Sequence, residues 1–118
     1  MIIGTGVDIT EVRRIKQAVE KWGDDFLFRV FTENEIKNAR TKTFFYQHLA
    51  GRFAAKEAIF KAAGDKKLSW QDIQIHNDRE GKPICSFLNG RGENINVYIS
   101  ISHVKTYAVA NAIVAKKS

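Results

Sequence analysis

Only one cysteine, one proline and no long apolar run occur in this sequence, and each shortage excludes a class of protein. Cys85 has no second cysteine with which to form a disulfide or a cysteine-rich zinc cage, and this fits a reducing compartment. No apolar stretch approaches the ~18 residues of a membrane span, and the N-terminus shows no basic leader before an apolar core. We therefore expect a cytoplasmic protein that does not cross a membrane.

Internal repeats, low-complexity segments and Pro/Ser-rich linkers are also missing. The 118 residues are therefore expected to form a single domain, 1–118. Hydrophobic residues make up 44% of the chain, which is too many for a disordered polymer. A chain of this length hides only ~65% of the surface that its unfolded form exposes, so the core is small and partner subunits would complete it.

Acidic residues are fewer than basic ones. The chain has 19 Lys and Arg against 13 Asp and Glu, which gives a net charge of +6. This excess favours an anionic partner, and nucleic acid, a phosphorylated small molecule, an acidic protein and a membrane surface are all candidates. Composition alone does not choose among them.

Helical patterns dominate the first half of the chain. Residues 2–9 are expected to form a short strand, and apolar residues at positions 12, 15, 19 and 22 then predict a helix that ends at Gly23. A Thr-x-x-Glu capping box at Thr32 and Glu35 predicts a helix over 33–40. An Ala-rich segment without proline predicts a long, slim helix over about 44–63, which ends before Gly64.

Strand patterns dominate the second half. Alternating apolar residues predict strands near 73–75, 83–87, 97–103 and 107–115, with turns between them. Helices followed by an antiparallel meander indicate an α+β fold, in which the helices pack against one face of a mainly antiparallel sheet.

The candidates for chemistry are an acid at a strand end, an acid and a lysine on a helix, and a histidine at a strand end. These are Asp8, then Glu57 with Lys61 one turn later, and His103. Each also has a structural interpretation, as a helix cap, as an ion pair worth about 0.3–0.5 kcal/mol, or as a structural histidine. A dinucleotide-binding loop is excluded because no third glycine opens a helix after Gly6.

Together, Asp8, Glu57, Lys61, Arg52 and His103 suit a site that holds a divalent metal ion against phosphates. Magnesium takes one or two carboxylates and completes its shell with phosphate oxygens and water, while Lys and Arg neutralise the remaining charge.

Four segments in this order resemble holo-acyl-carrier-protein synthases, the small 4′-phosphopantetheinyl transferases of bacterial fatty acid synthesis. They are Gly4-x-Gly6-Val7-Asp8-Ile9, the block from Ala50 to Ala62 with its Lys56-Glu57-x-x-x-Lys61 core, Gly81-Lys82-Pro83 and Ser100-Ile101-Ser102-His103. The resemblance implies the 4′-phosphopantetheinyl transferase fold and a homotrimer with active sites between neighbouring subunits. The strand surface at 97–101 and 108–114, which the few helices cannot cover, is compatible with a trimer.

The resemblance also implies an activity. The serine of an apo acyl carrier protein would attack the β-phosphate of coenzyme A, and 3′,5′-ADP would leave. Asp8 and Glu57 would hold Mg²⁺, Lys61 would stabilise the charge on the phosphates, and either Glu57 or a water molecule on the metal would be the general base. Such chemistry depends mainly on positioning and electrostatics.

Further roles follow from the same resemblance. Arg52 and His103 would contact the 3′-phosphate of coenzyme A, and Lys42 lies in a segment that helps there. Lys61 would also belong to the coenzyme A phosphate site. The first helix would dock the acidic carrier protein through Arg14 and Lys21, with Arg29 as a further candidate.

The chain departs from the family pattern at three places: the loop Gly64-Asp65-Lys66-Lys67, Val104 in place of a common threonine, and acids at Gly23-Asp24-Asp25. The alternative hypothesis is a basic nucleic-acid-binding domain that uses the helix with Arg13, Arg14 and Lys16, although no such motif is recognisable. The cognate carrier and the preference for Mg²⁺ or Mn²⁺ stay open.

Overall fold

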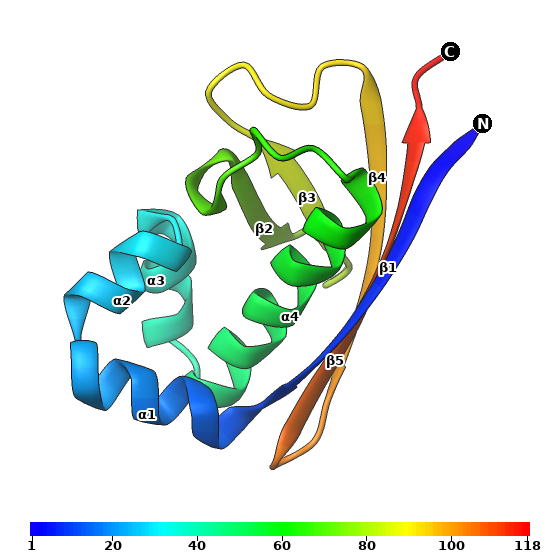
Figure 1. The fold of residues 1–118 in the computed structure, drawn as a ribbon. Helices are drawn as coiled ribbons and strands as arrows, with labels where there is room; N and C mark the ends of the chain where they lie inside the picture. The colour runs from blue at the N-terminus through cyan, green and yellow to red at the C-terminus, as the bar shows by residue number, and fades with distance from the viewer.

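The first and last strands of the chain pair with each other. In the computed structural model, which describes residues 1–118, β1 (Ile2–Glu11) is antiparallel to β5 (Tyr107–Lys116), and β5 is antiparallel to β4 (Ile95–His103). The resulting sheet has the order β1-β5-β4, and both termini lie at one end of it (Figure 1). No helix in the structure combines the length and the apolar character needed to cross a bilayer.

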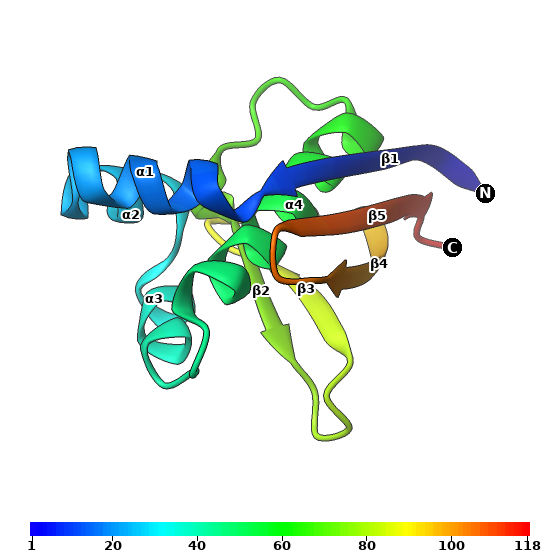
Figure 2. The ribbon, with the colours of Figure 1, turned by 90° about the horizontal axis from the view of Figure 1, so that it is seen from below.

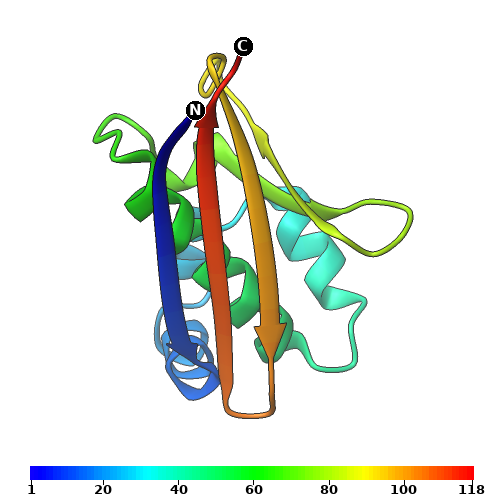
Figure 3. The ribbon, with the colours of Figure 1, turned by 90° about the vertical axis from the view of Figure 1, so that its right-hand side faces the viewer.

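The helices lie on one side of this sheet, as the sequence predicts. They are α1 (Val12–Trp22), α2 (Asp24–Val30), α3 (Glu33–Arg40) and α4 (Phe45–Ala63). Helix α4 lies directly against the sheet, and the other three lie farther out, whereas the opposite face of the sheet carries no helix (Figures 1 and 3). The α+β prediction is therefore confirmed.

The first two strands of the predicted meander separate from the rest. Strands β2 (Ile73–Asn77) and β3 (Pro83–Phe87) form a two-stranded hairpin of their own, which projects away from the three-stranded sheet (Figure 2). Ile73 and Ile75 are buried, because this hairpin packs against α3 and α4. The prediction of one continuous meander is wrong in this respect.

Helix α4 lies very close to β1 because the residues that face each other on the two elements are glycine and alanine. A Cβ atom on Gly6 would lie 2.1 Å from the backbone oxygen of Ala58, and one on Gly4 would lie 2.2 Å from that of Ala62. Only glycine fits such an approach without displacing the helix. The glycines before Asp8 therefore serve close packing, and this packing brings β1 beside the second half of α4.

The sequence analysis did not predict two short elements. Helix α2 has seven residues, and the η1 turn (Trp70–Asp72) has three. The predicted helix boundaries elsewhere agree well: the capping box at Thr32 and Glu35 forms both of its hydrogen bonds, and Gly64 ends α4 in the left-handed conformation.

Candidate active site

Strand β1 and the second half of α4 bring Asp8, Glu57 and Lys61 together. The expectation that Asp8 ends its strand is wrong, because β1 continues to Glu11. Nζ of Lys61 lies 3.4 Å from Oδ1 of Asp8 and donates a hydrogen bond of 2.9 Å to the backbone oxygen of Val7. The hydroxyl of Thr10 donates to Oδ2 of Asp8 at 2.6 Å. The Asp8 carboxylate is thus held in place from two sides.

The charges of Asp8 and Lys61 act on the pKa of Glu57 in opposite directions. Partial burial and the negative charge of Asp8 raise the pKa of Glu57, and the positive charge of Lys61 opposes this rise. Lys61 forms its ion pair with Asp8 on β1 and not with Glu57 on its own helix. The i,i+4 ion pair that the sequence allowed is therefore replaced by a contact between two elements.

Two carboxylates that repel each other are a donor set that suits a divalent cation. No group of three or more His, Cys, Asp or Glu side chains lies close enough to hold a metal ion by itself. Magnesium does not need such a group, since it binds through one or two carboxylates and completes its shell with water and phosphate oxygens. Asp8 and Glu57 fit this type of site, in which a phosphorylated substrate supplies the missing ligands.

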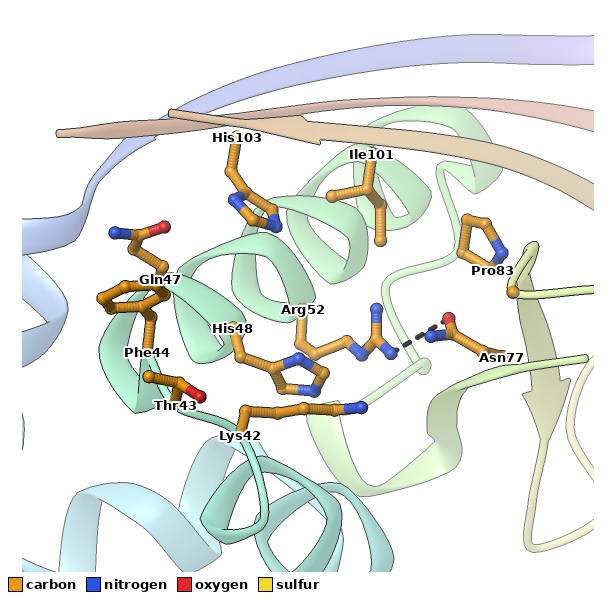
Figure 4. Close-up of a pocket in the computed structure, with 11 residues that line it drawn as sticks. Lys42, Thr43, Phe44, Gln47, His48, Arg52, Asn77, Pro83, Ile101 and His103 are labelled. Atoms are coloured by element: carbon orange, nitrogen blue, oxygen red, sulfur yellow. Dashed lines mark hydrogen bonds between the residues drawn. The ribbon is translucent and has the colours of Figure 1, made fainter. Parts of the chain in front are cut away.

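A separate cavity of about 430 Å³ lies between the first half of α4, the end of β4 and the β2–β3 hairpin (Figure 4). Its lining contains four basic side chains and no acidic one: Lys42, His48, Arg52 and His103. Arg52 is only 7% exposed, and its Nη2 donates a hydrogen bond of 3.1 Å to Oδ1 of Asn77. Such a cavity is suited to an anion such as a phosphate group.

His48 is a pocket residue that the sequence analysis missed. Burial is the main cause that lowers the pKa of His48 to about 4, and the charges of Arg52, Lys42 and His103 contribute to the same shift. Its Nε2 is buried and has no hydrogen-bond partner. The signal was available, because His48 lies one helical turn before Arg52 and so on the same face of α4.

The carboxylate site and the basic pocket are on different sides of one chain. Arg52 and Lys61 are nine positions apart, so at ~100° per residue their side chains leave α4 in opposite directions. Asp8 belongs to the edge strand β1 and His103 to the other edge strand β4, with β5 between them. Within a single chain, the structure therefore does not bring Lys61 together with Arg52 and His103.

The three basic residues expected to dock a carrier protein are exposed on the first two helices. Arg14 lies 3.8 Å from Glu11, Lys21 lies over the ring of Trp22, and Arg29 is in the last turn of α2. Arg14 also lines a groove of about 520 Å³ that includes Asp8, together with Phe26, Phe53 and Tyr107. The basic face of α1 is therefore continuous with the carboxylate site.

The three departures from the family pattern lie in the first turn of α2, directly after β4 and in the loop after Gly64. Asp24 and Asp25 stand in the first turn of α2, where acids stabilise the positive end of the helix dipole. Val104 is exposed directly after β4 and supplies no hydroxyl to the pocket. Nothing in the structure explains the sequence of the loop after Gly64.

Comparisons with known proteins find relatives that match nearly the whole chain. The family model of the 4′-phosphopantetheinyl transferase superfamily matches residues 4–112. The holo-acyl-carrier-protein synthase of Clostridium tetani is 44% identical over 97% of this chain and 96% of its own length, and that of Thermodesulfovibrio yellowstonii is 44% identical over 97% and 99%.

Solved structures give the same result. The Bacillus anthracis holo-acyl-carrier-protein synthase in complex with coenzyme A (3′,5′-ADP) has a TM-score of 0.86 and 39% identity, with 99% of both chains covered. The Helicobacter pylori enzyme in complex with coenzyme A has a TM-score of 0.84 and 32% identity, with 94% of this chain and 99% of that chain covered.

Proposed function

Because the chain belongs to the 4′-phosphopantetheinyl transferase superfamily, and within it to the holo-acyl-carrier-protein synthases, we propose the following reaction for it. The serine hydroxyl of an apo acyl carrier protein attacks the β-phosphate of coenzyme A. The 4′-phosphopantetheine group passes to the serine, 3′,5′-ADP leaves, and the holo carrier serves fatty acid biosynthesis in the cytoplasm. One observation carries the proposal: a paired-carboxylate site and a basic pocket occur in the chain of an enzyme whose relatives bind coenzyme A.

The basic pocket is proposed to hold the 3′-phosphate of coenzyme A. Arg52 and His103, with Lys42 beside them, place positive charge around a cavity that contains no acid. The guanidinium of Arg52 is held in place by Asn77, so little freedom is lost when a phosphate binds. These side chains would fix the nucleotide half of the substrate and leave its pyrophosphate to reach the carboxylate site.

At the carboxylate site, Asp8 and Glu57 are proposed to hold Mg²⁺ against that pyrophosphate. The chemistry that Mg²⁺ supplies there is Lewis-acid polarisation of the phosphoryl oxygens. Thr10 and Lys61 hold the Asp8 carboxylate, and the Lys61 ammonium provides positive charge beside the transferred phosphoryl group. The residues thus orient the substrate and stabilise charge, which is the main requirement of phosphoryl transfer.

A complete site is proposed to form between two copies of this chain within a homotrimer. The carboxylates lie at the β1 edge and the basic pocket at the β4 edge of the sheet, so one copy would offer its β1 edge to the β4 edge of the next. The face of the sheet that carries no helix (Figure 3) supports this assembly. Val7 and Ile9 on β1 and Tyr98 on β4 are each more than half exposed. The outward positions of β1 between 3 and 9 carry no Lys or Arg, unlike a sheet that binds RNA.

The carrier protein is proposed to dock on the basic face of α1. Arg14 lies both on this face and in the groove that contains Asp8, so a carrier bound there would present its serine to the carboxylate site. Lys21 extends the same positive surface and Arg29 on α2 adds to it, and such a surface would attract an acidic helix and speed its association.

The test is a mass measurement. Purified chain, coenzyme A, Mg²⁺ and a competent apo carrier protein should give the mass increase of one 4′-phosphopantetheine group, on one serine of the carrier. An unchanged carrier mass, in an assay where an established transferase modifies the same carrier, would contradict the proposed function.

A further inference from the structure

A buried ion pair that the proposed reaction does not use lies behind the basic pocket. Nζ of Lys56 on α4 is 2.6 Å from Oε1 of Glu35 on α3, and both side chains are fully buried. The Lys56 ammonium also donates to the backbone oxygens of Val30 at 2.9 Å and of Trp70 at 3.0 Å. All three of its hydrogens are thus used, and the pair ties α4 to α3, to the end of α2 and to η1.

The same carboxylate also holds strand β2. Oε2 of Glu35 accepts a hydrogen bond of 2.7 Å from the backbone N–H of Ile75, while Oε1 accepts one of 2.8 Å from the N–H of Thr32. Two residues after Ile75, β2 ends at Asn77, and Asn77 is the residue that meets Arg52 in the pocket (Figure 4). One carboxylate therefore fixes the strand whose end orients the pocket arginine.

Glu35 also acts on Arg52 through its charge. Burial lowers the pKa of Arg52, and the negative charge of Glu35 opposes this lowering. No acid lines the pocket itself, so the Glu35 carboxylate stabilises the charged guanidinium from behind without occupying the place of a phosphate.

Stability alone is a poor explanation for this pair. Removing two charges from water is costly, and apolar side chains of similar volume often stabilise a core as well as a buried ion pair does. What apolar side chains could not supply is the hydrogen bond that sets the position of Ile75.

We propose that Glu35, through its pair with Lys56 and its bond to Ile75, is a positioning residue for recognition of the 3′-phosphate. It sets the β2–β3 hairpin against α4, so that Asn77 and Arg52 meet. The proposal rests on the proposed function, because it takes the basic pocket to be the site of that phosphate.

The test measures nucleotide binding to the full chain by calorimetry, without any transfer step. The affinity for adenosine 3′,5′-bisphosphate divided by that for adenosine 5′-phosphate gives the discrimination for the 3′-phosphate. Glu35→Gln and the volume-conserving double variant Glu35→Met/Lys56→Met should lower this discrimination roughly tenfold. Binding of adenosine 5′-phosphate should stay within about twofold of the original value.

Two further variants separate positioning from stability. Val114→Ala removes buried methyl groups from β5, which is outside the network, and should lower the melting temperature while the discrimination stays unchanged. Asn77→Ala, at an exposed position, should lower the discrimination by itself, and Glu35→Gln should then add little to it.

The outcomes are distinct. A folded Glu35 variant with the original discrimination overturns the proposal. If neither Glu35 variant folds, Asn77→Ala decides: unchanged discrimination overturns the proposal, and lowered discrimination supports it. If the Glu35 variants lose discrimination as expected but the original chain transfers nothing to a competent carrier, the proposed function is contradicted and the role of Glu35 stands.

Discussion

Lys61 reaches across from α4 to β1, where its Nζ lies 3.4 Å from Oδ1 of Asp8 and 2.9 Å from the backbone oxygen of Val7. The contact joins the two elements that carry the two acids. It also leaves the Glu57 carboxylate without a cation of its own helix, and the pKa of Glu57 is raised by burial and by Asp8. The arrangement favours a divalent cation between the two acids over two separate ion pairs.

Replacing either acid should abolish transfer and spare the fold. Asp8→Asn and Glu57→Gln keep the shape of the side chain but remove the charge that a cation needs. We expect kcat to fall roughly 100-fold or more, as measured by the mass of the carrier protein. The melting temperature should change little, because both side chains are only partly buried.

The matched control is Glu93→Gln. Glu93 is an exposed acid in the loop before β4 and has no ion pair. It loses the same charge as Glu57→Gln and should retain full transfer. A comparable loss of transfer in Glu93→Gln and Glu57→Gln would mean that the net charge of the chain, and not the carboxylate pair, controls the rate.

Metal removal should separate the two halves of the site. With EDTA, transfer should stop, and added Mg²⁺ should restore it. Binding of adenosine 3′,5′-bisphosphate should remain within about twofold, because the proposed contacts from Arg52, His103 and Lys42 need no metal. Undiminished transfer after exhaustive EDTA treatment would contradict the magnesium site.

Much of the fold could be predicted because its signals are local. The capping box at Thr32, the glycine after α4 and the alternation along β4 and β5 each depend on a few neighbouring residues. Helix α2 was missed because seven residues, Asp24–Val30, are too few to show a helical period. The separate β2–β3 hairpin was missed because alternation identifies a strand but not its partner.

The residues of the site could be predicted better than their arrangement. Spacing placed Glu57 and Lys61 on one helical face, and the close packing at Gly6 brings Asp8 to them. Arg52 and Lys61 are nine positions apart on α4, and this spacing already implies that their side chains point in opposite directions. The sequence analysis did not make this prediction. Lys56, next to Glu57 in the same motif, is instead part of the core, because its partner Glu35 is distant in sequence.

Gly6→Ala should destabilise the chain. The new methyl group would lie 2.1 Å from the backbone oxygen of Ala58, and the backbone of α4 cannot yield as a flexible side chain does. We expect a loss of about 2–3 kcal/mol in the free energy of unfolding, measured by urea denaturation. A midpoint equal to that of the original chain would show that α4 and β1 are farther apart in solution.

A charge on the uncovered face of the sheet should disrupt the proposed trimer. Tyr98 is 57% exposed at the middle of β4, away from both halves of the site, so Tyr98→Glu should fold normally. Light scattering should detect single chains, and transfer should fall because, in the proposed trimer, the site is completed between copies. The control Phe28→Glu, at a 53% exposed position on α2, should stay trimeric. A fully active monomer would contradict the shared site.

The stability of the chain should depend on pH through His48. Its pKa is about 4 in the folded chain against the ordinary value of 6.5. Above pH 6.5 the ring is neutral in both folded and unfolded chains and has no effect. Between pH 6.5 and 4 only the unfolded chain takes up the proton, so stability is lost as the pH falls. Urea midpoints of the original chain and of His48→Gln should therefore diverge in this range and run parallel above it.

A bound phosphate should reverse this shift. The positive charges of Arg52, Lys42 and His103 contribute to the low pKa of His48, and an anion among them would oppose their effect. Adenosine 3′,5′-bisphosphate should therefore raise the pKa of His48, which NMR of the imidazole signals would follow during a pH titration. By linkage, the affinity for this nucleotide should increase as the pH falls from neutral towards the free-chain pKa of about 4, and His48→Gln should reduce the increase. A pKa of His48 that stays at about 4 with saturating nucleotide would place the phosphate outside this pocket.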